Sequence, residues 1–245
     1  MSVVTLPDCA TLLVRQLSTT LEWPAAAIDR LHEAHGRHRR LAAGEALVHA
    51  GSPMRGLFVA MQGSLKSVST DADGNEQVMG FHLAGELIGL GALFHGRYRN
   101  SIFALVDSEV CEVALEPFEA AARSVPGVQH SLLRLAGRGV ALDQDHMEIL
   151  GHKQALERIS LFLAQLSRRH QRLGLPHLRL HLDMSRQEIA SYLGIVIETV
   201  SRGFGVLQDE GVIEVHGRDL RILQPERLGR PLIECGLPSF NRKRH

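Results

Sequence analysis

The stretch that decides the fold is Ser185-Arg186-Gln187-Glu188-Ile189-Ala190-Ser191-Tyr192-Leu193-Gly194, followed at once by Ile195-Val196-Ile197-Glu198-Thr199-Val200-Ser201-Arg202. Ser185 and Glu188 form an S-x-x-E capping box, which marks the start of a helix. Gly194 is suited to a tight turn, and a second helix should run from there to about Gly211, a residue type that commonly ends helices. The stretch therefore predicts two short helices around a glycine turn.

The second of these helices carries a polar edge. Glu198, Ser201 and Arg202 are separated by three and four residues, so their side chains project from one helix face. Two packed helices with a solvated Glu–Arg pair are the alternative, and such a pair stabilises a helix by only about 0.2–0.5 kcal/mol. The edge is typical of a helix-turn-helix in which these three residues read DNA bases.

The segment that follows favours the DNA-binding interpretation. Val212–Leu223 alternates apolar and polar residues around His216-Gly217-Arg218-Asp219, which is the pattern of a β-hairpin. A hairpin directly after the second helix predicts a wing whose basic tip, His216 and Arg218, faces DNA phosphates. We also assign phosphate contacts to Ser185 and Arg186 at the start of the first helix.

Composition narrows the class of protein. The 245 residues suffice for one large or two modest domains, and 27 Lys and Arg balance 27 Asp and Glu. A neutral net charge argues mainly against non-specific DNA binding. It argues less against sequence-specific DNA binding, for which a local basic edge suffices. No apolar run approaches eighteen residues and no signal segment begins the chain, so we expect a cytoplasmic protein without a membrane partner.

The order of the patterns predicts an α+β protein. Short apolar runs punctuated by Gly, Pro and Asp indicate a β-roll (jelly roll), preceded by a short helix over Pro24–His35. A helical period of roughly 25 residues follows Pro126, then a helix over Gln154–His170 and a hairpin-like stretch over Leu178–Leu182. The expected domains are an N-terminal arm (1–24), the β-roll (25–125), a long central helix (126–152), a winged helix-turn-helix (153–230) and a tail (231–245).

Two apolar stripes run along the predicted central helix, so it should have two partners. One stripe can pack on the β-roll and the other on a second copy of the chain, although a single helix buried inside one domain would also carry apolar residues. Asp143 would be costly if it faced its own copy while charged, which makes it a candidate control point. The expected dimer seam consists of Leu133, Ala136, Val140, Asp143 and Met147.

Taken together, these patterns resemble the CRP/FNR family of bacterial transcription regulators over nearly the whole chain. The motifs similar to those of the family are Gly56-Leu-Phe-Val-Ala-Met-Gln-Gly-Ser-Leu65, Gly80-Phe-His-Leu-Ala-Gly-Glu-Leu-Ile-Gly89, Leu142-Asp-Gln-Asp145, Glu157-Arg-Ile159 and Ile197-Glu-Thr-Val-Ser-Arg202. The resemblance implies a homodimer that binds double-stranded DNA at a TTGAT-N4-ATCAA-like palindrome and acts on RNA polymerase.

The same resemblance assigns base reading to Glu198, Ser201 and Arg202, and the chemistry agrees. Arg202 can donate two hydrogen bonds to guanine O6 and N7, while Glu198 can accept one from cytosine N4 of the same pair. Val196 departs from the family, which often has Thr or Ser there. Val196 cannot cap the helix through its side chain, and losing such a cap costs about 1 kcal/mol.

The sensed signal is the least determined part of the sequence. Relatives of the FNR branch hold a [4Fe–4S] cluster on four cysteines, whereas Cys9 and Cys111 alone match those positions here and Leu12 and Ser18 stand at two others. Since a cubane cluster needs four ligands, usually thiolates, we expect no such cluster.

A cyclic nucleotide is an alternative effector. Gly85-Glu86-Leu87 is similar to the ribose-contacting motif of the family, but Asn100 stands where an arginine is expected before Ser101. Arg99 and Arg97 lie close by, although a shift of one residue in a strand turns a side chain to the other face. The candidate effector pocket is therefore Glu86, Arg97, Arg99 and Ser101.

Two further alternatives are a regulator that responds to thiol oxidation and a protein that is an enzyme. Cys9 and Cys111 could form a redox pair that ties the arm to the β-roll, or Cys111 could be a core residue and Cys9 an idle thiol. A jelly-roll metalloenzyme would need converging histidines and a carboxylate, yet His49, His82 and His95 are scattered. We therefore expect no metal, no catalytic residues and a regulator instead of an enzyme.

Overall fold

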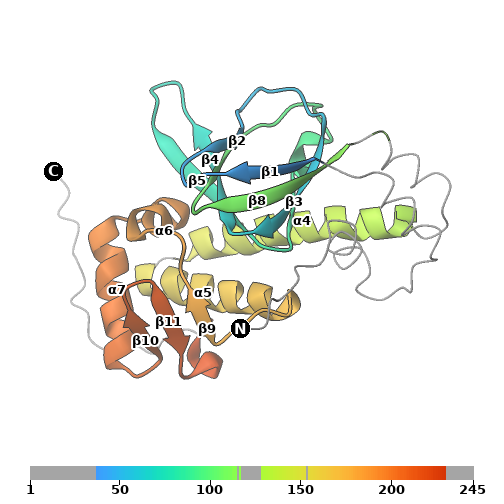
Figure 1. The fold of residues 1–245 in the computed structure, drawn as a ribbon. Helices are drawn as coiled ribbons and strands as arrows, with labels where there is room; N and C mark the ends of the chain where they lie inside the picture. Colours follow the sequence, from blue (N-terminus) through green and yellow to red (C-terminus); the bar gives the residue numbers. More distant parts are fainter. Residues whose placement is uncertain (1–36, 115, 117–127, 153, 230–245) are drawn as a thin grey trace. The chain divides into compact units, whose positions relative to one another are not determined.

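The computed structural model describes residues 37–114, 116, 128–152 and 154–229 (Figure 1). The predicted arm over 1–24, the helix over Pro24–His35 and the tail over 231–245 lie outside these residues. The chain divides into two compact units. The first contains Met1–Asp145 and Asp183–Tyr192, and the second contains His146–Leu182 and Leu193–His245.

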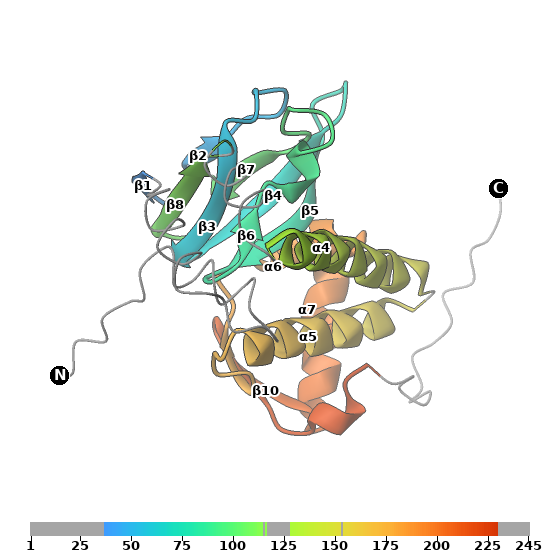
Figure 2. The same cartoon turned by 90° about the vertical axis from the view of Figure 1, so that its right-hand side faces the viewer.

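Two four-stranded antiparallel sheets form the predicted β-roll in the first unit (Figure 2). Turn residues separate the short apolar runs of this part of the chain, so each run forms one strand. One sheet has the order β1 (His38–Leu41), β8 (Ser108–Ala114), β3 (Gly56–Gln62) and β6 (Leu87–Ile88). The other has the order β2 (Ala46–Val48), β7 (Ser101–Ala104), β4 (Ser64–Thr70) and β5 (Glu76–Leu83).

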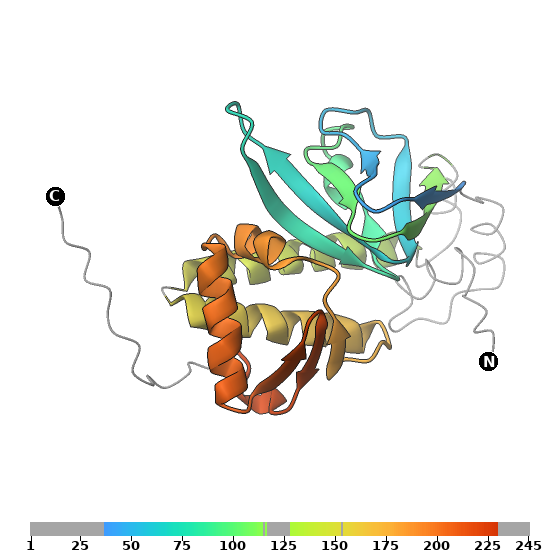
Figure 3. The same ribbon diagram turned by 60° about the vertical axis from the view of Figure 1, so that its left-hand side comes forward.

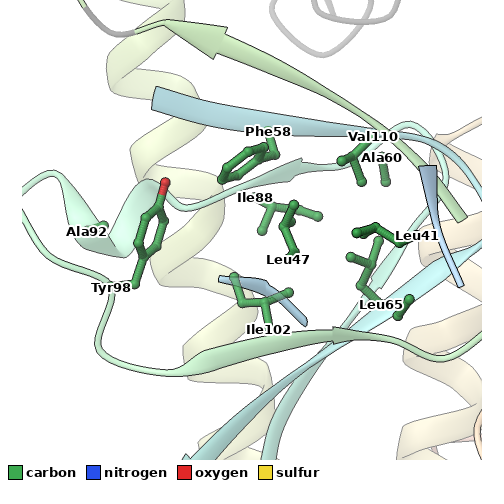
Figure 4. Packing of buried hydrophobic residues seen from close by; sticks show 11 residues of the cluster. Leu41, Leu47, Phe58, Ala60, Leu65, Ile88, Ala92, Tyr98, Ile102 and Val110 are labelled. Carbon is green, nitrogen blue, oxygen red and sulfur yellow. The ribbon is translucent and has the colours of Figure 1, made fainter. Parts of the chain in front are cut away.

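The interior of the roll is filled by apolar side chains from both sheets, which point toward one another (Figure 4). The hydroxyl of buried Tyr98 donates a hydrogen bond to the carbonyl oxygen of Gly56 at 2.7 Å. Burial, with a smaller contribution from the charge of Glu112, raises the pKa of Tyr98 to about 12. The core consists of Leu41, Leu47, Phe58, Ala60, Leu65, Ile88, Ala92, Tyr98, Ile102, Ala104 and Val110.

The predicted central helix is α4 (Val128–Gly151), and a short 3-10 helix, η1 (Leu90–Ala92), precedes β7 in the roll. Gly139 on α4 lies near η1, because a Cβ placed on it would be 4.0 Å from Cδ1 of Leu90. One side of α4 therefore packs on the roll, as the sequence predicted for one of its two stripes.

The second unit contains α5 (Ala155–Arg172), α7 (Ile197–Asp209), a three-stranded sheet and the 3-10 helix η2 (Pro225–Arg227). The sheet has the order β10 (Ile213–His216), β11 (Asp219–Ile222) and β9 (Arg179–His181). Figure 3 shows the β10–β11 hairpin beside α7, where the sequence predicted a wing.

The hairpin-like stretch predicted over Leu178–Leu182 is wrong. This stretch contains a single strand, β9, which pairs with β11 of the wing. The backbone N–H of Leu182 donates to the carbonyl oxygen of Arg218, and that of Ile222 donates to Leu178. Five residues are too few for two strands and a turn, so their backbone groups find partners in a distant strand instead.

The lengths and compositions of the described helices bear on membrane crossing. None of these helices is by itself long and apolar enough to cross a membrane, and one bent pair, α6 (Arg186–Leu193) with α7, could do so by length and composition only.

Candidate nucleic-acid interface

The first predicted helix of the motif, α6, begins with the expected capping box. The backbone N–H of Ser185 donates to Oε2 of Glu188 at 2.7 Å, and the backbone N–H of Glu188 donates to the Ser185 hydroxyl at 3.2 Å. Partial burial alone would raise the pKa of Glu188, but hydrogen bonds from Lys66 and Ser185 outweigh it and hold the pKa below its usual value. The capping carboxylate is therefore strongly held in its charged form.

The turn after α6 depends on glycine. Gly194 has a φ of +62°, in the left-handed region that side-chain-bearing residues rarely adopt. In the second unit, the Arg158 guanidinium donates to the carbonyl oxygen of Leu193 at 3.0 Å. This bond satisfies one of the carbonyl groups that the end of a helix leaves without an intrahelical partner.

The second predicted helix, α7, exposes all three predicted base-reading residues. Glu198, Ser201 and Arg202 are exposed, and the contacts that hold Arg202 are long, at 3.4 Å to the Glu198 carbonyl and 3.5 Å to the Thr199 hydroxyl. Its guanidinium is thus only loosely restrained by the helix. The opposite side of α7 is buried and consists of Val200, Gly203, Phe204 and Leu207.

The start of α7 confirms the expected missing cap. Val196 occupies the N-cap position with an extended backbone and no side-chain hydrogen bond to the helix. Its carbonyl oxygen accepts from the backbone N–H groups of Thr199 and Val200, so the first turn forms without a side-chain cap.

The tip of the wing is exposed and contains both predicted phosphate-contacting residues. His216 and Arg218 flank Gly217, whose φ of +63° closes the turn between β10 and β11. A nitrogen of His216 lies 3.4 Å from a carboxylate oxygen of Glu214. The tip therefore carries one permanent cation, Arg218 on the two-residue turn, and one histidine at the end of β10.

The two remaining phosphate candidates are more enclosed. The Ser185 hydroxyl belongs to the capping box, while the Arg186 side chain is half-buried, and this burial lowers its pKa. A guanidinium titrates far above neutral pH, so Arg186 stays charged at the start of α6.

On α4 the predicted seam is exposed along its whole length. Leu133 is 71% exposed, Val140 56% and Met147 63%, and Ala136 and Asp143 between them are exposed as well. Large apolar side chains at this exposure on one helix face make it a candidate contact surface.

Three of the four candidate effector residues form hydrogen bonds with backbone groups of the roll. Oε2 of Glu86 accepts from the backbone N–H of Leu83 at 2.9 Å, and the Arg97 guanidinium donates to the carbonyl oxygen of Gly51 at 2.7 Å. The Ser101 hydroxyl accepts from the backbone N–H of Ala50 at 3.0 Å, and Arg99 is exposed. Glu86, Arg97 and Ser101 therefore hold turns of the roll.

Cys111 lies on β8 with its side chain fully buried, and it is disulfide-bonded. The other two cysteines of the chain, Cys9 and Cys235, lie outside the described residues. Among the residues that the structure does describe, no group of three or more His, Cys, Asp or Glu could hold a metal ion.

One feature of the site was missed by sequence reasoning. Lys66 on β4 donates to Oε1 of Glu188 at 2.7 Å across 122 positions of sequence. The one available signal was that Lys66 is among only three lysines in the chain and interrupts an otherwise uncharged strand.

Comparison with known proteins agrees with this architecture. The model of the cyclic nucleotide-binding domain matches residues 38–124, and that of the Crp-like helix-turn-helix domain matches residues 157–230. The transcriptional activator protein anr of Pseudomonas aeruginosa is 38% identical over 217 residues, which cover 88% of this chain and 87% of that protein. The fumarate and nitrate reduction regulatory protein of Escherichia coli is 32% identical over 215 residues, covering 88% and 85% of the two chains.

Among solved structures, FixK2 from Bradyrhizobium japonicum superposes with a TM-score of 0.71 at 29% identity, covering 79% of this chain and 95% of that one. The matched relatives are transcription regulators and not enzymes. With a roll of the cyclic-nucleotide-binding type, a capped helix-turn-helix and a wing, the chain belongs to the CRP/FNR family of bacterial transcription regulators.

Proposed function

We propose that two copies of this regulator bind a TTGAT-N4-ATCAA-like inverted repeat in the cytoplasm and activate transcription through RNA polymerase. The observation that carries the proposal is the exposed polar edge of α7, where Glu198, Ser201 and Arg202 face away from the buried side of the helix. An arginine and a carboxylate one turn apart suit the guanine and the cytosine of one base pair.

Dimerisation is supported by the exposed seam on α4. An inverted repeat presents two equivalent half-sites, so a two-fold symmetric protein matches it. Leu133, Val140 and Met147 recur every seven residues, which is the spacing that keeps apolar side chains on one contact line between two helices. A second copy of α4 is thus the occupant that best fits this face.

Substitution of Glu198 tests base reading. Glu198→Ala should relax discrimination at the contacted C·G pair by about 1–3 kcal/mol, because the cytosine amino group loses its acceptor. The measurement is a fluorescence-anisotropy titration of the palindrome and of duplexes changed at that pair. Asp209→Ala, which removes an exposed acid from the far end of the same helix, is the matched control and should keep full discrimination.

DNA binding by the wild-type protein can contradict the proposed sequence specificity directly. Equal affinity for the palindrome and for scrambled DNA of the same length, across salt concentrations, would rule out the proposed reading of sequence.

We further propose that the protein responds to a redox signal through a disulfide between Cys9 and Cys111. One specific observation favours this proposal. Cys111 is disulfide-bonded, whereas Glu86, Arg97 and Ser101 of the alternative nucleotide site already bond to the roll backbone. In the oxidation, two thiols lose two protons and two electrons to a small-molecule disulfide, which leaves as two thiols.

A [4Fe–4S] cluster does not fit these residues. The chain has three cysteines in all, Cys111 is fully buried and disulfide-bonded, and a cubane cluster needs four ligands. The proposal therefore assigns the cysteines to thiol chemistry.

A further inference from the structure

The first helix of the DNA-binding motif is held by the β-roll. Asp183–Tyr192, which contains most of α6, belongs to the same compact unit as the roll strands. Figure 3 shows α6 beside the ribbon formed by β4 and β5. The strand register places Lys66 opposite Phe81 on this ribbon, so both side chains lie on one face of it.

Four contacts connect the ribbon to this segment. The Ser64 hydroxyl donates to Oδ2 of Asp183 at 2.6 Å, and the Val78 backbone N–H donates to the Ser191 hydroxyl at 2.9 Å. The rings of Phe81 and Tyr192 lie 5.2 Å apart, and Lys66 pairs with Glu188 at 2.7 Å. The contacts extend from a residue just before the capping box to the last turn of α6, so they set the orientation of the helix.

The Lys66–Glu188 pair also changes the charge at the helix start. Ser185 and Arg186 are the proposed phosphate contacts, and the N-terminus of a helix favours an anion. Glu188 places a carboxylate in this first turn, where it caps the helix but repels an approaching phosphate. Lys66 supplies the compensating charge, and both side chains are about one-fifth exposed, so solvent screens the pair only in part.

We propose that Lys66 is a positioning residue for DNA binding. By neutralising Glu188, it allows the start of this helix to approach a phosphate, and it makes DNA affinity depend on how the β4–β5 ribbon is placed. This inference rests on the proposed DNA-binding function, and it gives the sensory roll a direct physical connection to the DNA interface.

The test is a double-mutant cycle on DNA affinity in the full-length protein. Lys66→Ala should weaken binding to the palindrome about threefold to tenfold, because it leaves the Glu188 carboxylate uncompensated. Glu188→Gln should bind at least as tightly as the wild type, since glutamine also completes a capping box and the carboxylate that repels a phosphate is gone. The double variant Lys66→Ala/Glu188→Gln should regain wild-type affinity, which a general loss of structure would not allow.

Salt dependence separates positioning from direct contact. The slope of log affinity against log salt concentration should be the same for Lys66→Ala and the wild type, because Lys66 touches a carboxylate and not DNA. Arg55→Ala, which removes one exposed cation elsewhere on the roll, is the matched control and should leave affinity unchanged.

A double variant as weak as Lys66→Ala would overturn the inference. A slope reduced by about one for Lys66→Ala would overturn it too, because it would make Lys66 a phosphate contact. Wild-type affinity in Lys66→Ala would overturn it as well. These three results are interpreted only if the wild type binds the palindrome more tightly than scrambled DNA. A wild type without this preference would contradict the proposed function instead.

Discussion

At the scale of single residues, Gly203 and Gly205 show how one helix can contain the same residue type for different reasons. Both lie in the interior of α7, where glycine is about 1 kcal/mol less favourable than alanine. A Cβ on Gly203 would come within 2.4 Å of Cδ1 of Ile159 on α5, whereas a Cβ on Gly205 would meet nothing within 4 Å. A side chain at the first position would therefore displace the end of the Ile159 side chain, whereas one at the second would displace nothing.

These positions give opposite predictions for stability. Gly203→Ala should destabilise the protein by about 1 kcal/mol net, because overpacking against the fully buried Ile159 side chain exceeds the gain in helix propensity. Gly205→Ala should stabilise it by about 0.5–1 kcal/mol. Urea unfolding at one fixed protein concentration measures both. Equal stability of the two variants would show that the Ile159 side chain makes room for a methyl group without cost.

At the scale of elements, α4 combines a packed side with an exposed apolar side. Gly139 lies against Leu90 of the roll, while Leu133, Val140 and Met147 are more than half exposed. A helix that is apolar on two sides is expected to pack against two partners. Asp143 interrupts the exposed apolar side. A charged carboxylate destabilises an apolar contact, so Asp143 would weaken any contact made through this side.

The seam predicts that Asp143 limits dimerisation. In a two-fold dimer Asp143 faces its own copy, and two carboxylates repel each other. Asp143→Ala should therefore tighten the dimer about twofold to fivefold, as measured by sedimentation equilibrium. Asp145→Ala, on the other side of the same helix, is the control and should leave the dimer unchanged. A weaker dimer in Asp143→Ala would contradict this seam.

At the scale of the whole molecule, regulation requires that a change in the roll reaches the DNA-binding elements. The ribbon β4–β5 contacts α6 directly, and β8 of the same roll contains the disulfide-bonded Cys111. The redox change proposed at Cys111 would act on the same compact unit that holds α6. Coupling between two such sites is commonly worth 1–3 kcal/mol, about fivefold to 150-fold in affinity.

The redox proposal is tested by cysteine substitutions. DNA affinity of the wild type should differ about fivefold or more between a reducing buffer and one containing oxidised glutathione. Cys9→Ser and Cys111→Ser should each abolish this difference, because either change removes one half of the disulfide. Cys235→Ser is the matched control and should retain it. A response that persists in Cys111→Ser would exclude the proposed pair.

The sequence by itself determined the local features of this protein. The capping box of Ser185 and Glu188, the left-handed turn at Gly194, the uncapped Val196 and the alternation of the wing all involve residues within a few positions of one another. Their conformations follow from backbone sterics and nearby hydrogen bonds, so a single sequence predicts them. The exposed edge of α7 follows from helix periodicity for the same reason.

Only the tertiary structure decided what is joined across long distances in the chain. It paired β9 with the wing and not with a hairpin of its own, used Glu86, Arg97 and Ser101 to hold turns of the roll, and brought Lys66 to Glu188. Such contacts depend on which strand faces meet and which polar groups are left for pairing after the core forms, and no local pattern encodes that choice.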